Sequence, residues 1–141
     1  MLRPDVEETA AQFRGLLSSI IRDPDGSQQL LNIVANAPDS PRSLDELAWL
    51  LATHPDSKFR DGARAIALSE RACALTERRA PIMLDTLAAA YAEAGDFPRA
   101  ITAGEEALKR AHSAGDTDAA KLSENILASL NAKVPYRQKP E

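Results

Sequence analysis

Apolar residues recur at a spacing of three or four positions in two stretches near the middle of the chain. The two sets are Leu44, Leu47, Ala48 and Leu51, and Leu84, Leu87, Ala88 and Tyr91. Residues three or four positions apart lie on one face of an α-helix. Each stretch therefore predicts a helix with one buried stripe, and the pattern favours an all-α fold.

These two helices are copies of one another, and a second pair of copies follows them. Leu44 and Leu84 stand 40 positions apart, whereas Arg64 and Arg99 in the second pair stand 35 apart. The difference is a five-residue insertion within residues 53–59 of the first copy. Closing a longer loop costs only about 0.6 kcal/mol per doubling of its length, so we expect a surface connection that folding does not need.

A tight turn joins the two helices of the second copy. Gly95 is of the residue type that ends helices, Asp96 can cap the next helix through its side-chain oxygen, and Pro98 suits a first helical turn. The repeating unit is therefore helix, turn, helix.

Residues 81–114 resemble the tetratricopeptide repeat (TPR), a helical unit of about 34 residues with large apolar, small and aromatic residues at set positions. The matching residues are Leu84, Leu87, Ala88, Tyr91, Ala100 and Ala107, with Leu84 at the place of the family's usual tryptophan. Gly104 and His112 depart from the usual aromatic and proline. The resemblance implies a right-handed α-solenoid of antiparallel helix pairs, whose concave groove holds a peptide or helix of a partner protein.

The chain is expected to form one domain over residues 1–133, followed by a tail at 134–141. Its predicted parts are a degenerate helix pair at 7–40 with Phe13, Leu17, Leu30 and Ile33 in its core, a repeat with the insertion at 41–80, a repeat at 81–114 and a capping helix at 116–133. A terminal helix with one apolar side is what the last repeat of a solenoid needs, because it covers an apolar edge.

Composition and charge narrow the range of functions. Apolar residues make up 44% of the chain and aromatic residues 4%, a mixture that favours close-packed helices over a β-sandwich. A net charge of −4 repels a phosphate backbone, so we expect no nucleic-acid partner. No apolar run is long enough to span a bilayer and the single Cys73 cannot form an intramolecular disulfide, so we expect a soluble, cytoplasmic protein with no membrane partner.

Candidate catalytic and metal-binding residues are few. Cys73 stands at the position of Leu108 in the other copy, which predicts a core residue and not a nucleophile. His54 and His112 lie in different repeats without a further ligand at metal-binding spacing. We therefore expect a non-enzymatic protein with no cofactor and no metal, because no acid, base and nucleophile come together.

The flank of each first helix, about 100° from its buried stripe, is the expected partner-binding groove. Its predicted residues are Arg42, Asp45, Trp49, Ala52, Ile82, Asp85, Ala89, Ala92 and Glu93. The two aspartates, expected to lie off the buried stripe, favour a basic peptide. Trp49 is either an anchor for the partner or a residue packed under the insertion against Phe59.

An alternative function is self-association into a homodimer. The N-terminal helix carries more apolar residues than an end repeat should expose, namely Val6, Phe13, Leu16, Leu17, Ile20 and Ile21. A further possibility is that the chain is one piece of a longer repeat array or of a membrane-anchored protein.

Overall fold

The computed structural model describes residues 14–37 and 39–138, and this part of the chain contains helices and no strand. Residues 14–22 are helical, and the further helices are α2 (Gly26–Ala35), α3 (Pro41–Thr53), the 3-10 helix η1 (Ser57–Phe59), α4 (Gly62–Leu75), α5 (Pro81–Glu93), α6 (Phe97–Ser113) and α7 (Thr117–Asn131). The all-α prediction is confirmed for these residues. Val6 and Phe13, two residues of the predicted dimer face, lie outside the described residues. None of the described helices is long and apolar enough to cross a membrane.

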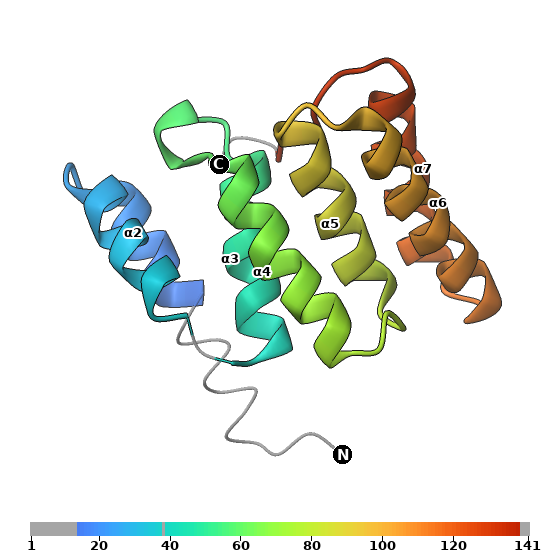
Figure 1. The fold of residues 1–141 in the computed structure, drawn as a ribbon, viewed down its shortest axis with the longest axis horizontal. Coiled ribbons are helices and arrows are strands. Elements are labelled where there is room, and N and C mark those ends of the chain that lie inside the picture. Colours follow the sequence, from blue (N-terminus) through green and yellow to red (C-terminus); the bar gives the residue numbers. More distant parts are fainter. Residues whose placement is uncertain (1–13, 38, 139–141) are drawn as a thin grey trace.

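Helices α3, α5 and α7 form a row, in which α3 packs against α5 and α5 against α7. Helix α4 packs against α3 and α5, and α6 packs against α5 and α7, so that successive helices lie next to one another (Figure 1). Helix α5 thus has neighbours on several sides. Every residue from Leu84 to Ala90 is buried, which is more than one apolar stripe predicts.

Small residues allow the helices to approach closely. Ala48 and Ala88 are fully buried on neighbouring helices of the row. A Cβ at Gly104 of α6 would lie 2.8 Å from Leu127 Cδ2 of α7. Leu127 of α7 therefore occupies the space that a side chain at position 104 would need.

The predicted turn after α5 is confirmed. Gly95 has a positive φ of 85°, and the Asp96 side chain accepts a hydrogen bond from the Arg99 amide at 3.2 Å. Asp61 and Asp116 cap α4 and α7 in the same way, accepting from the amides three residues further on. An aspartate N-cap therefore begins each of these three helices. It satisfies an amide group that has no partner within the helix.

The insertion between α3 and α4 is more than the surface connection that we expected. Its central residues form η1, and Phe59 is only 2% exposed. The Phe59 ring packs edge-on against His54, with 4.9 Å between ring centroids, and the Asp61 amide donates to the Leu51 carbonyl at 2.8 Å. The connection is a packed element because Phe59 belongs to the hydrophobic core formed around α3.

Beyond α7 the chain turns and runs back across the molecule. Lys133 adopts a positive φ of 58°, and the segment that follows passes from α7 toward the end of α3 (Figure 1). At its far end the Gln138 amide donates to the Thr53 carbonyl at 3.0 Å. Residues 134–138 therefore lie on the helical domain, although the sequence predicted only a tail.

Candidate functional site

A pocket of about 290 Å³ opens on the row formed by α3, α5 and α7. Its walls are Asp45, Glu46, Trp49, Ile82, Asp85, Thr86 and Leu122. Four of the nine predicted groove residues, Asp45, Trp49, Ile82 and Asp85, thus line one cavity. Glu46, Thr86 and Leu122 were not predicted, because which residues line the pocket depends on how neighbouring helices of the row pack.

The two aspartates of the pocket are buried, contrary to our expectation that they lie off the buried stripe. Asp45 is 8% exposed and Asp85 is fully buried, because the next helix of the row covers each of them. Ser123 of α7 donates a hydrogen bond to Asp85 Oδ2 at 2.9 Å. The Thr86 hydroxyl of α5 donates to the Ile82 carbonyl at 3.0 Å and lies near enough to Asp45 to lower the pKa of that carboxyl. Each aspartate therefore has a hydroxyl group of the neighbouring helix beside it.

Burial also changes the acidity of both groups. Loss of solvation raises the pKa of Asp45 to about 7, against the opposing effects of Thr86 and Arg42. It likewise raises the pKa of Asp85 to about 7, with a further contribution from the charge of Asp45. Within the described part of the chain, Oδ1 of each aspartate is buried without a hydrogen-bond partner. Such an atom is costly, and a ligand that donated a hydrogen bond to it would be stabilised.

Trp49 stands between the pocket and the returning C-terminal segment. Its ring lies 5.6 Å from that of Tyr136, centroid to centroid, at an angle of 46°. The Phe59 ring, in contrast, packs edge-on against His54. Trp49 was predicted either to anchor a partner or to pack against Phe59. The structure supports neither role alone, because the indole is half-buried and its ring partner is an aromatic residue of the C-terminal segment.

Glu93, predicted at the margin of the groove, binds two arginines at the end of α5. Arg137 Nη2 lies 2.7 Å from Glu93 Oε2, and Arg60 Nε lies 3.2 Å from Oε1. Arg137 also donates to the Ala52 carbonyl at 3.4 Å. The insertion, through Arg60, and the C-terminal segment, through Arg137, thus meet on one carboxylate. Sequence reasoning missed this contact because the two arginines stand far apart in the chain.

The remaining predicted groove residues are partly buried between helices and partly exposed to solvent. Ala52, Ala89 and Ala92 are buried where helices pack, so they set the distance between helices and do not form a wall. Arg42 is exposed, and its charge opposes the rise in the pKa of Asp45.

The predicted dimer face is smaller than its sequence implies. Leu17 and Ile20 are 5% and 3% exposed and belong to the core around α3, so they are not available for a contact with a second copy. Leu16 is 48% exposed, and Ile21 is half-buried. The helical periodicity of this stretch indicated the apolar residues correctly, but it did not show which of them face the chain's own core.

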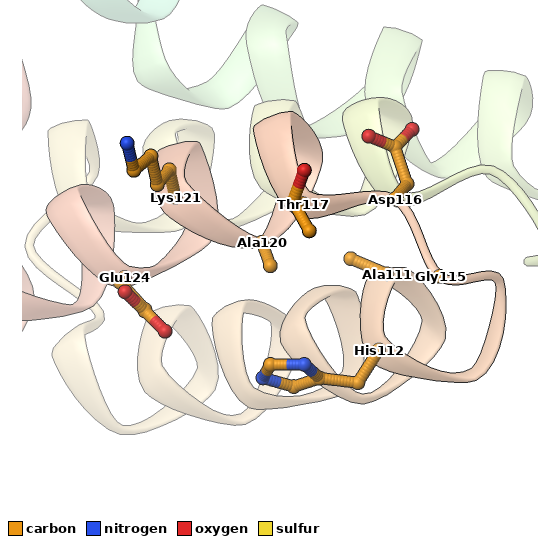
Figure 2. A pocket seen from close by; sticks show the side chains of 8 residues that line it. All are labelled: Ala111, His112, Gly115, Asp116, Thr117, Ala120, Lys121 and Glu124. Atoms are coloured by element: carbon orange, nitrogen blue, oxygen red, sulfur yellow. The ribbon is translucent and has the colours of Figure 1, made fainter.

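A second pocket, of about 250 Å³, lies between the end of α6 and the start of α7. Figure 2 shows His112 extending from α6, and Lys121 and Glu124 from α7. These polar side chains are exposed. We assign this pocket no chemistry.

Residues 14–37 and 39–138 were also searched for metal-binding groups. The described residues contain no group of three or more His, Cys, Asp or Glu that could hold a metal ion. Cys73 is fully buried, as predicted, and burial raises the pKa of its thiol to about 12, so it is inert as a nucleophile near neutral pH. Comparisons of the chain with models of protein families, with curated proteins and with solved structures find no match.

Proposed function

We propose that this protein is a non-enzymatic interaction module of the TPR-like α-solenoid type, which binds a peptide segment of a partner protein on the face formed by α3, α5 and α7. One observation carries the proposal: the chain's own C-terminal segment already lies, as a non-helical peptide, across the C-terminal ends of α3 and α5, where it contacts Trp49, Thr53 and Glu93. A surface that holds one peptide in this manner has the contacts needed to hold another.

The contacts of the segment are those by which peptides are recognised. One main-chain hydrogen bond joins Gln138 to Thr53, an aromatic pair joins Tyr136 to Trp49, and an ion pair joins Arg137 to Glu93. Trp, Tyr and Arg are the residues that most often dominate the free energy of binding at interfaces. The preferred partner is therefore a segment with an aromatic and a basic residue.

The pocket itself supports binding rather than catalysis. Carboxyl groups with a pKa near 7 occur in active sites, but they also occur where structural packing buries them. Here Ser123 joins Asp85 to the neighbouring helix α7, the Thr86 hydroxyl donates to the Ile82 carbonyl, and no cysteine, serine, lysine or histidine lines the pocket. We therefore assign these carboxyl groups to recognition.

Removal of the C-terminal segment tests this function. A chain ending at Lys133 should bind a labelled peptide of residues 132–138, measured by fluorescence anisotropy, whereas the full chain should bind it much more weakly because its own segment occupies the face. Trp49→Ala in the shortened chain should weaken binding by about 2 kcal/mol. Circular dichroism establishes that both shortened proteins are folded. If the folded, shortened chain shows no affinity for the peptide, the face is not a peptide site.

Self-association is the second candidate function, favoured by the 48% exposure of Leu16 and the 41% exposure of Leu31. Light scattering on the full chain should then report a dimer. Leu16→Lys should convert it to a monomer without loss of helicity, since the side chain lies outside the core.

A further inference from the structure

The C-terminal end of α3 keeps two carbonyl groups that its own connection does not use. The last four carbonyls of an α-helix have no amide partner within the helix. In α3, the amides of residues 54 and 61 donate to the first two of these carbonyls, at 3.1 and 2.8 Å. No amide of residues 54–61, all of which the structure describes, donates to the next two, those of Ala52 and Thr53. The helix therefore ends with two adjacent acceptors for another segment.

The equivalent end of α5 is closed by its own turn. The amides of residues 94, 95 and 96 donate to three of its last four carbonyls, at 3.1, 3.0 and 2.9 Å. The open end of α3 thus goes with the longer connection of the first copy and is not a property of the repeat itself.

The C-terminal segment supplies the missing donors. The Gln138 amide donates to the Thr53 carbonyl at 3.0 Å, and Arg137 Nη1 donates to the Ala52 carbonyl at 3.4 Å. Arg137 Nη2 lies 2.7 Å from Glu93 Oε2 at the end of α5. These three acceptors, the carbonyls of Ala52 and Thr53 and the carboxylate of Glu93, form what we call the arginine seat.

The arginine seat carries negative charge that is partly shielded from water. The C-terminal end of a helix bears a partial negative charge, and the Glu93 side chain is only 16% exposed. Arg60 of the insertion lies 3.2 Å from Glu93 Oε1 and also donates to the His54 carbonyl at 2.8 Å. The insertion therefore holds one oxygen of the carboxylate and leaves the other to a second cation.

The positions of the acceptors select the kind of cation. The Ala52 carbonyl and the Glu93 carboxylate belong to different helices, and two different nitrogens of one guanidinium group reach them. A guanidinium group is planar and holds its donors in a fixed fork, whereas a lysine ammonium has a single nitrogen. Tyr136, directly before Arg137, places its ring 5.6 Å from that of Trp49. The seat thus fits an arginine that follows an aromatic residue.

We infer that the arginine seat recognises a partner segment in which an aromatic residue precedes an arginine, and the arginine precedes a residue other than proline. The third residue must have a backbone N–H for the Thr53 carbonyl, and proline has none. The identity of the occupant as a partner rests on the proposed peptide-binding function, whereas the preference of the seat for arginine does not.

The chain's own segment tests the seat without any added peptide. Arg137→Lys in the full chain keeps the positive charge but removes the fork, so hydrogen exchange at the Gln138 amide should become about tenfold faster. Arg110→Lys, at an exposed position of α6, is the matched control and should leave this exchange unchanged.

Peptides test the recognition of a partner. The full-length chain with Tyr136→Ser and Arg137→Ser loses two contacts of its own segment, while every helix keeps its residues. Fluorescence anisotropy then compares a labelled peptide of residues 132–138 with three versions of it. Two replace its arginine by lysine or by citrulline, the neutral isostere, and the third methylates the backbone nitrogen of its glutamine. Each version should bind about tenfold more weakly than the parent peptide or worse.

Glu93→Gln, added to the same chain, assigns the charge preference to the carboxylate. The arginine and citrulline peptides should then bind within about twofold of one another. Glu105→Gln, at an exposed position of α6, is the matched control and should keep the full preference for arginine. Circular dichroism shows whether Glu93→Gln is folded after the loss of its Arg60 contact. If it is not, the peptide series on the chain with Glu93 intact still decides.

The outcomes separate this inference from the proposed function. Equal affinity for all four peptides overturns the arginine seat and leaves the peptide-binding function. Absence of binding by every peptide overturns that function, and the partner arginine with it. The inference is also overturned if lysine binds as tightly as arginine, if folded Glu93→Gln keeps the preference for arginine over citrulline, or if Arg137→Lys leaves exchange at the Gln138 amide unchanged.

Discussion

The helix pairs α3/α4 and α5/α6 are copies in sequence that differ in how their helices are joined. Eight residues, 54–61, separate α3 from α4, whereas three, 94–96, separate α5 from α6. The short connection only turns the chain, through Gly95 and the Asp96 cap. The long connection adds Phe59 to the core and places Arg60 against Glu93. An insertion that looks expendable in sequence thus helps to build the surface on which the C-terminal segment lies.

The starts of α4 and α6 sharpen the contrast. Gly62 begins α4, and Phe97 stands at the equivalent position of α6. A Cβ at Gly62 would lie 2.8 Å from the Ala94 backbone nitrogen, at the end of α5. The second copy carries a half-buried aromatic residue at this place, and the first carries none because the end of the neighbouring repeat lies against it.

Among single substitutions, the largest expected loss of stability is at Phe59. Phe59→Ala should lower the free energy of unfolding by about 3 to 5 kcal/mol, because it removes a buried ring and leaves a cavity. The matched control is Phe97→Ala in the second copy. The Phe97 side chain is only half-buried, so its removal should lower the free energy of unfolding by less. Urea unfolding measures both. Equal losses would show that the insertion contributes no more than an ordinary turn.

The equivalent aspartates Asp45 and Asp85 make stability depend on pH. Their pKa in the folded chain is about 7, above the value of about 3.9 for an unperturbed aspartate, so the folded state holds more protons between these values. Stability should therefore fall as the pH rises from about 4 to 7, with a limit of about 1.4 kcal/mol per pH unit for each carboxyl. Thermal unfolding of the parent and of Asp45→Asn checks this. The variant should show the flatter profile, and an unchanged slope would contradict the assignment.

A smaller effect is expected at Gly62. Gly62→Ala should destabilise the chain by about 1 to 3 kcal/mol, because the added methyl group meets backbone atoms at Ala94 that cannot move freely. Gly15→Ala is the control, since a Cβ there meets nothing within 4 Å and alanine favours a helix. The explanation given for the difference between the two copies fails if both substitutions stabilise the chain.

The smallest effect concerns the contacts of the C-terminal segment. Tyr136→Ala should cost about 0.5 to 1.5 kcal/mol, the typical contribution of an aromatic pair. Because the segment carries little of the core, its release should appear as faster hydrogen exchange at the Gln138 amide rather than as a lower melting temperature. Protection that is unchanged in the variant would mean that Arg137 and Glu93 hold the segment without the ring contact.

Local chemistry made the helices and turns predictable. Gly95, Asp96 and Pro98 specify their turn through their own backbone and capping preferences, and the core stripe follows from residue spacing. Phe59 was also recognised as a residue that could pack, but loop length alone gave no reason to expect that it does.

The candidate site was less predictable because it depends on contacts between distant segments. Periodicity placed Asp45 and Asp85 beside the buried stripe, yet the helix row covers this flank as well. Tyr136 and Arg137 carry no periodic signal in the sequence. Their contacts with Trp49 and Glu93 arise only when the chain turns back after α7.

The return of the C-terminal segment has a quantitative consequence for any competitor. A segment attached to its own binding face by a short linker is present there at an effective concentration on the order of millimolar. A free peptide at micromolar concentration must therefore bind the same contacts about a thousandfold more tightly to displace the segment from half of the molecules. Under the proposed function, the affinity that a competing peptide needs thus depends on the covalent connection as well as on the contacts of Arg137 and Tyr136.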